Sequence, residues 1–419
     1  MTRPAQPLSV YIHIPFCTVK CGYCDFNAYA GLDTLRGAYR DAVIAELRAA
    51  APSLAGYTAA TIAFGGGTPG EMPSGDIAAI IAAVREAVEV APMAEVSLEA
   101  NPGTSGDRGL TALRDAGVTR ISFGAQSFDA DELRFLDRIH SPEAIGAAVH
   151  LARGAGFESV SLDLIYGLPG QSLASWQRTL EHAIALETDH ISCYALTVED
   201  ATPLARRVQR GEVQSATADA AADHYELATA LLADAGFRQY EISNWAKPGH
   251  QSRHNRVYWT DGDYLAIGAG AHGYMGGERY ENAAHPRVYI DQVRSTAPGN
   301  TRPAVVNAYR PDEATAIFDW LTLRLRLLEG FDPALFEARF GCSLDAVVGP
   351  VFDDCEAAGV IQRDGRIRLT ERGRLLHGEL SVLLLAHLRA EAQSPARRRL
   401  AKETQSLAAD PALPGRRST

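Results

Sequence analysis

Residues 11–27 read Tyr-Ile-His-Ile-Pro-Phe-Cys-Thr-Val-Lys-Cys-Gly-Tyr-Cys-Asp-Phe-Asn, and this stretch decides the fold. Three of the six cysteines of the chain, Cys17, Cys21 and Cys24, fall within eight residues and have the spacing C-x3-C-x2-C. The apolar, β-branched run before them predicts a strand over Ser9–Phe16, with Tyr11 and His13 on one of its faces. The spacing therefore brings three thiolates together on the loop that follows this strand.

Three thiolates on one loop can hold three irons of a [4Fe–4S] cubane, whereas ordinary electron-transfer clusters use four cysteines. The fourth iron is then open to a small molecule. Zinc is an alternative, but a structural zinc is held by four closed ligands; His13, just before the loop, could be the fourth. A third explanation is a group of buried free cysteines, against which the density of the cluster argues.

Composition bounds the class of protein. The length of 419 residues suggests two domains, or one large barrel with an appendage. An apolar content of 46% and a charged content of 22% are typical of a soluble globular chain. The formal net charge of −11 argues against broad nucleic-acid binding. No signal peptide or long apolar run is visible, so we expect a cytoplasmic protein with reduced thiols and no stable membrane insertion.

Strands and helices alternate along the first half of the chain. Such alternation predicts an α/β fold with a parallel sheet and right-handed crossovers. Most strands end in a polar or glycine-rich cluster, which is typical of a (β/α) barrel whose site gathers at the strand ends. Six units predict a partial (β/α)6 TIM-like barrel, open on one side. The six predicted strands are Ser9–Phe16, Thr61–Phe64, Glu95–Ala100, Arg120–Gln126, Ser159–Tyr166 and His190–Thr197.

Three side chains are predicted to cap helices that follow these strands. Asp33, Ser74 and Ser141 each precede an apolar helical pattern and belong to the residue types that favour the N-cap position. The helices are expected to reach about Ala50, Val90 and Gly154.

The last third of the chain has a different pattern. We expect residues 1–297 to form the barrel and its extension, 304–385 a second domain, and 386–419 a disordered tail rich in Pro, Ala, Arg and Ser. Helices over 312–328, 333–340 and 343–358, followed by a hairpin with an Asp364-Gly365 turn, indicate a winged-helix-like module. The last helix before the hairpin is acidic and would repel phosphate, so the module is interpreted as a packing or lid domain.

Several strand ends carry groups that could bind a ligand. Gly65–Pro69 offers bare backbone, although three glycines equally suit a tight turn. Glu99 ends an apolar strand and needs a partner, which could also be a neighbouring arginine. Asp163 ends another apolar strand and could bind ribose hydroxyls. Gln126 could hydrogen-bond a ribose or a carboxylate, and Arg138 carries a guanidinium suited to a carboxylate, although alone it reads as a surface residue.

A second motif follows the barrel at His254-Asn255-x-x-Tyr258-Trp259. By itself it reads as a loop with a hydrogen-bonded histidine and two packed aromatic rings. Histidine is also a common axial ligand of heme iron, and Tyr and Trp can stack on a porphyrin.

The motifs Tyr-Ile-His-Ile-Pro-Phe-Cys and Cys-x-Tyr-Cys-Asp-Phe resemble those of the radical S-adenosylmethionine (SAM) superfamily. Within it they resemble the oxygen-independent coproporphyrinogen III oxidase family and its HemW heme-chaperone branch, from Tyr11 to about Leu384. The resemblance implies that Cys17, Cys21 and Cys24 hold a [4Fe–4S] cluster whose open iron binds SAM, and that His254 contacts heme. It assigns to the first SAM residues Tyr11, Gly66, Gly67, Thr68 and Glu99. It assigns to a second SAM residues Tyr23, Gln126, Arg138, Asp163 and Ala195.

Two departures from the oxidases favour the chaperone branch. The oxidases have a further cysteine two residues after the third cluster cysteine, where this chain has Phe26, and a long N-terminal extension, where only ten residues precede Tyr11. The resemblance thus implies a chaperone that binds heme, the cluster and SAM, and passes heme to an unidentified acceptor, with a respiratory protein as one candidate. The alternatives are a SAM-cleaving radical enzyme, such as a coproporphyrinogen III oxidase acting on a porphyrin-like substrate, and a zinc-stabilised binding protein.

Overall fold

The computed structural model describes residues 5–104 and 106–392. The chain divides into two compact units, residues 1–310 and 311–419. The linker region expected around 298–303 lies before strand β14 (Val305–Tyr309), which is hydrogen-bonded into the sheet of the first unit. The first unit therefore runs further along the chain than residue 297.

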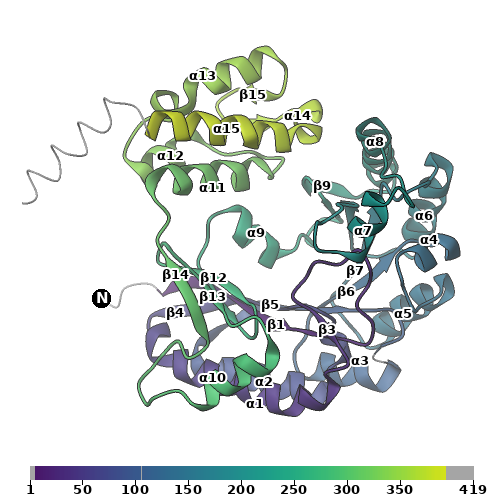
Figure 1. Cartoon of the computed structure of the whole chain (residues 1–419), viewed down its shortest axis with the longest axis vertical. Coiled ribbons are helices and arrows are strands. Elements are labelled where there is room, and N and C mark those ends of the chain that lie inside the picture. Colours follow the sequence, from purple (N-terminus) through teal and green to yellow (C-terminus); the bar gives the residue numbers. More distant parts are fainter. Residues whose placement is uncertain (1–4, 105, 393–419) are drawn as a thin grey trace, which may run out of the picture. The chain divides into compact units, whose positions relative to one another are not determined.

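A curved sheet forms the first unit, and its central strands follow one another in chain order (Figure 1). Every neighbouring pair among them is parallel, which confirms the predicted partial (β/α) barrel. These six strands are β1 (Gln6–Ile14), β4 (Tyr57–Gly66), β5 (Glu89–Ala100), β6 (Arg120–Gln126), β7 (Ser159–Tyr166) and β8 (His190–Ala195).

Further strands extend the sheet at both edges. Strand β11 (Tyr264–Ile267) pairs parallel with the free side of β1, a neighbour that the sequence did not predict. Antiparallel strands β12 (His272–Met275), β13 (Glu278–Asn282) and β14 follow it, and β10 (Asn244–Ala246) and β9 (Arg238–Glu241) extend the edge at β8. Two short strands, β2 (Phe16–Cys17) and β3 (Tyr29–Ala30), pair across the cysteine loop.

Helices cover the outer face of the sheet (Figure 1). The longer ones are α1 (Arg36–Ala50), α2 (Ser74–Ala87), α3 (Gly106–Asp115), α5 (Pro142–Gly154), α6 (Leu173–Ala185) and α8 (Ala218–Asp234). Shorter helical segments of the unit are α4 (Ala130–Phe135), α7 (Pro203–Gln209), α10 (Pro286–Arg294) and the 3-10 turns η1 (Asp33–Leu35), η2 (Ala51–Leu54) and η3 (Pro69–Glu71). Helix α9 (Arg253–Trp259) does not belong to the outer layer, because its His254 and Tyr258 line the barrel interior.

The predicted capping side chains do not cap. Asp33 lies inside η1, and α1 begins after Leu35 without a side-chain cap. Ser74 is the first residue of α2, and Ser141 holds the N-cap position of α5 but makes no capping hydrogen bond. The N-cap position was thus wrong for Asp33 and Ser74, which follow a helix start set by η1 and by Pro73, and right for Ser141, whose hydroxyl makes no capping hydrogen bond.

Strand alternation makes the inside of the barrel polar. On β1, Val10 and Ile12 are fully buried in the core beneath the helices, whereas Tyr11 lines an interior cavity. On β7, Leu162 is in the same core and Asp163 lines the interior cavity. Successive side chains of a strand point to opposite faces, so the apolar set packs outward and the polar set points inward.

The second unit contains the three predicted helices and the hairpin. They are α11 (Glu313–Leu325), α12 (Pro333–Phe340), α13 (Leu344–Ala357), β15 (Ile361–Arg363) and β16 (Ile367–Leu369), followed by α14 (Glu371–Leu375) and α15 (His377–Ala392). Arg363 of the hairpin pairs with Asp353 and Glu356 of the acidic helix α13. Helix α15 was not predicted, and it shows that residues 386–392 are helical. The rest of the predicted tail, 393–419, lies outside the described residues. No helix of the described chain is long and apolar enough to cross a membrane.

Candidate functional site

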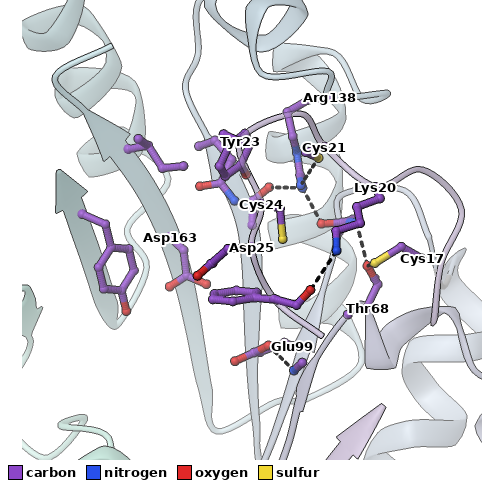
Figure 2. A pocket seen from close by; sticks show the side chains of 18 of the residues that line it. Cys17, Lys20, Cys21, Tyr23, Cys24, Asp25, Thr68, Glu99, Arg138 and Asp163 are labelled. Carbon is purple, nitrogen blue, oxygen red and sulfur yellow. Dashed lines mark hydrogen bonds between the residues drawn. The ribbon is translucent and has the colours of Figure 1, made fainter. Parts of the chain in front are cut away.

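A cavity of about 430 Å³ opens at the carboxyl ends of the central strands and beside the cysteine loop (Figure 2). Parallel strands present these ends at one edge of the sheet, so polar groups that are distant in sequence meet there. All three cysteines line the cavity. Nine of the predicted cofactor residues also line it: Tyr23, Gly66, Gly67, Thr68, Glu99, Gln126, Arg138, Asp163 and Ala195. Tyr11 and His254 lie in an adjoining interior chamber instead.

Close backbone approach explains the two glycines after β4. A Cβ on Gly67 would lie 2.7 Å from the carbonyl oxygen of Phe16 and 2.9 Å from that of Ile14. Gly66 has a φ of 113°, and a Cβ there would lie 2.4 Å from the His13 ring. The Gly67 and Thr68 amides donate to Ile14 and Phe16 at 2.8 Å. The glycine turn therefore fixes the start of the cysteine loop, which accounts for these residues without a ligand as well.

Hydrogen-bonding groups face two of the cysteine sulfurs. Cys17 Sγ lies 3.4 Å from the Thr68 hydroxyl, and Arg138 Nη1 donates to Cys21 Sγ at 3.6 Å (Figure 2). Burial raises the pKa of the Cys17 thiol to about 11 and also raises the pKa of Cys24. All three thiols are free of disulfides. Cysteines that bind a metal must lose their protons, and donors at sulfur favour the thiolate.

Three thiols of one loop beside an open cavity suit an iron–sulfur cluster, which spreads its thiolates over separate irons. His13 cannot complete a zinc site here, because its ring nitrogens contact the Tyr11 hydroxyl at 3.0 Å and the Asn27 carbonyl oxygen at 2.9 Å.

The Asp137–Arg138 segment after α4 holds the middle of the cysteine loop. The Gly22 amide donates to Asp137 Oδ2 at 3.0 Å, and a Cβ on Gly22 would lie only 2.7 Å from that oxygen. Arg138 Nη2 donates to the Gly124 carbonyl at 2.7 Å and to the Asn101 side chain. Asp137 and Asn101 were not predicted as site residues from the sequence. The position of Asn101 directly after β5 was the one available signal, since strand ends were already expected to form the site.

Two carboxylates face the cavity at its floor. Glu99 Oε2 accepts from the Gly66 amide at 3.3 Å, and Glu99 makes no ion pair with an arginine of the described chain. Exclusion of bulk water and then the charge of Asp163 raise the pKa of Glu99 to about 7. Burial raises the pKa of Asp163, against hydrogen bonds from Ser192 and from Ser122 at 2.8 Å. A positively charged ligand would favour the ionised form of both groups.

The interior chamber of about 140 Å³ contains His254 in a closed hydrogen-bond network. Its Nδ1 lies 2.7 Å from the Thr61 hydroxyl and its Nε2 lies 2.8 Å from the Tyr258 hydroxyl. The side chain is 3% exposed, and burial lowers its pKa to about 3. Both ring nitrogens contact hydroxyl groups, as expected for the hydrogen-bonded histidine that the motif alone suggested. The heme contact of His254 stays a prediction.

Comparisons with known proteins agree with this geometry. The profile of the Radical SAM superfamily matches residues 11–183, and that of the HemN C-terminal domain matches residues 312–376. A heme chaperone HemW from Mycobacterium tuberculosis (strain CDC 1551 / Oshkosh) is 42% identical over 378 residues, which span 89% of this chain and 93% of the relative. HemW of Escherichia coli K12 is 37% identical over 392 residues, 91% and 98% of the two chains.

A solved structure resembles the whole arrangement. Coproporphyrinogen III oxidase (HemN) from Escherichia coli, described as a radical SAM enzyme, superposes with a TM-score of 0.79 at 25% sequence identity. The match covers 91% of both chains.

Proposed function

Because this chain belongs to the radical SAM superfamily and, within it, to the HemW family of heme chaperones, we propose that it binds heme, a [4Fe–4S] cluster and SAM, and passes heme to an acceptor protein. One observation carries the cofactor part of the proposal. Three free cysteines of a single loop line the same cavity as the polar ends of the parallel strands.

We assign the cluster to Cys17, Cys21 and Cys24. A cluster bound there supplies electron transfer and one iron open to a small ligand. The residues around it suit SAM, which carries an amino group, a carboxylate and a sulfonium. Glu99 and Asp163 favour positive charge, Arg138 suits a carboxylate, and the backbone at Gly66 lies beside Glu99. A second SAM in the same cavity is part of the proposal.

The heme site belongs to another part of the molecule than His254. Both nitrogens of that ring are engaged, so we propose that His254 holds helix α9 against the barrel wall. The acceptor is a separate protein, and a heme-requiring respiratory protein remains our candidate.

A radical enzyme acting on a porphyrin-like substrate is the second candidate. The structural likeness to coproporphyrinogen III oxidase over 91% of both chains favours it. Phe26, at the position where the oxidases have a cysteine, favours the chaperone.

One paired assay on a single anaerobic sample separates the two. After reconstitution with iron and sulfide, we expect a broad iron–sulfur absorption band, and a Soret band on addition of hemin. We expect coproporphyrinogen III to remain unchanged when SAM and reductant are supplied. Decarboxylation of coproporphyrinogen III without heme binding would overturn the chaperone proposal, and stoichiometric zinc without iron would overturn both candidates.

A further inference from the structure

Exposed apolar side chains form part of the lining of the cysteine cavity. Phe26 is 62% exposed, Val19 is 42% exposed and Tyr194 is 40% exposed, and all three line the same cavity. Exposed hydrophobic residues are ordinary when they are scattered, whereas several at one cavity mark a binding surface. The floor of that cavity is polar, with Glu99 and Asp163. The lining of the cavity therefore combines apolar side chains with charged and polar ones.

The backbone of Phe26 is fixed although its side chain is exposed. Its carbonyl oxygen accepts hydrogen bonds from the Ala28 amide at 2.7 Å and from Lys20 Nζ at 3.0 Å. Ala28 itself is buried. An aromatic ring on a backbone held in this way loses little further freedom when a ligand covers it.

We propose that Phe26 is the platform on which the flat apolar face of heme rests. This inference rests on the proposed function. Aromatic side chains stack on planar rings, and the face of a porphyrin is large and apolar. Heme also carries two propionates. The ammonium group of Lys20 lies beside the Phe26 carbonyl and can pair with one of them.

Charged groups in the lining of the cavity set the orientation of the ligand. Asp25 and Glu199 line the cavity together with Lys20, so propionates are repelled from the two carboxylates and attracted to the ammonium. Phe26 occupies the position at which the oxidases have a cysteine, so the exchange replaces a thiol by a stacking surface on the loop of the cluster.

The test is a titration of the reconstituted anaerobic protein with hemin, followed at the Soret band. We expect Phe26→Ala to raise the Kd for heme by about tenfold or more, since it removes the ring and its apolar contact area. Phe26→Trp should restore binding, because it restores a stacking surface. Lys20→Gln should weaken binding less and make it less sensitive to salt.

Met93→Ala is the matched control. Met93 is 80% exposed but does not line the cavity, so its loss should leave the Kd unchanged. Iron and sulfide contents are measured on every variant. If Phe26→Ala loses the cluster, the Kd for heme is measured on Phe26→Leu instead, because leucine keeps most of the side-chain volume and lacks the ring.

The outcomes separate this inference from the proposed function. A wild-type protein that binds no heme would overturn the proposed function. A wild-type protein that binds heme, with an unchanged Kd in the cluster-containing Phe26→Ala or Phe26→Leu protein, would overturn only the assignment of the platform.

Discussion

The cysteine loop and the His254 motif both offer ligating atoms in the sequence, but the folded chain treats them differently. Cys17 and Cys21 line an open cavity, and the hydrogen-bonding groups nearest their sulfurs lie 3.4 and 3.6 Å away. His254 is 3% exposed, and its two nitrogens lie 2.7 and 2.8 Å from hydroxyl groups. A motif names the atoms that could bind a ligand, whereas packing decides which of them keep a free lone pair.

Removal of a cysteine from the loop that lines the cavity should have the largest effect. Cys17→Ala, Cys21→Ala and Cys24→Ala should each abolish the iron–sulfur absorption band after anaerobic reconstitution, because a cluster with an open iron already lacks one protein ligand. Iron and acid-labile sulfide contents measure the loss.

Cys193→Ala is the control for these variants. Cys193 is a fully buried residue of β8 and does not line the cavity, so its variant should retain the cluster. A cluster that survives all three single substitutions in the loop would contradict the assignment.

Substitution of His254 tests the other region of the comparison, the buried and hydrogen-bonded histidine. His254→Ala removes the ring that the Tyr258 hydroxyl contacts and one of the two partners of the Thr61 hydroxyl, which also donates to Ser9 Oγ at 2.7 Å. Each unsatisfied buried group costs about 1–3 kcal/mol. We expect the free energy of unfolding in urea to fall by about 2–4 kcal/mol. The heme affinity of the folded protein should stay as it is in the wild type.

The exposed His182 on α6 supplies the comparison, since His182→Ala should change stability by less than about 0.5 kcal/mol. If His254→Ala removes the Soret band while the urea midpoint is unchanged, His254 binds heme and the closed network does not describe the heme-bound protein.

The local sequence pattern predicted correctly the strands whose ends are marked by a polar or glycine residue. The bounds of β6 and β7 were predicted to the residue, because apolar alternation stops at a polar or glycine residue in both. Strand β4 was predicted four residues late, at Thr61 instead of Tyr57, since its start is rich in alanine. The parallel pairing of β11 with β1 joins residues far apart in sequence, and no local pattern records such a contact.

The site was predictable where topology alone positions a residue. Glu99 and Gln126 lie at the ends of parallel strands, and such ends meet at one edge, while Asp163 lies within β7 and ends only its apolar run. Asp137 was missed because its role depends on a backbone with a φ of 54° and on a contact with distant Gly22. The direction of the His254 ring was equally hidden, because it depends on a partner in another strand.

Acid should destabilise the closed network before it affects the cysteine loop. The folded-state pKa of His254 is about 3, below its ordinary value of 6.5, so its contribution to stability is complete above pH 6.5 and falls as the pH drops toward 3. At pH 5 the loss is about 2 kcal/mol. His254→Gln lacks this titration, so the difference in unfolding free energy between the two proteins should change by about 2 kcal/mol from pH 7 to pH 5.

Urea unfolding at several pH values measures this difference. His13, His140 and His190 also have lowered pKa values, so both proteins should lose stability in acid and only the difference isolates His254. A difference that stays constant with pH would mean that His254 is protonated in the folded protein, which would open the network.

The smallest expected effect concerns the donor at Cys21. Arg138 Nη1 lies 3.6 Å from that sulfur, and a hydrogen bond to a thiolate stabilises the more negative, reduced state of a cluster. Arg138→Met removes the charge and the donor, so the midpoint potential should become more negative by on the order of 50 mV, equivalent to about one charge-assisted hydrogen bond. Redox titration of the reconstituted protein, followed by electron paramagnetic resonance, measures the shift without an activity assay.

Arg134→Met separates this effect from a general loss of positive charge. Arg134 lies on helix α4, just before the Asp137–Arg138 segment, is exposed and pairs with Asp131, so its removal should leave the potential unchanged. Equal shifts in the two variants would assign the effect to long-range charge. No shift in either would mean that the hydrogen bond to Cys21 is absent once a cluster is bound. A shift confined to Arg138→Met would show that a side chain next to the cysteine loop adjusts the midpoint potential of the cluster. The ring nitrogens of His254, by contrast, are occupied by hydrogen bonds within the protein.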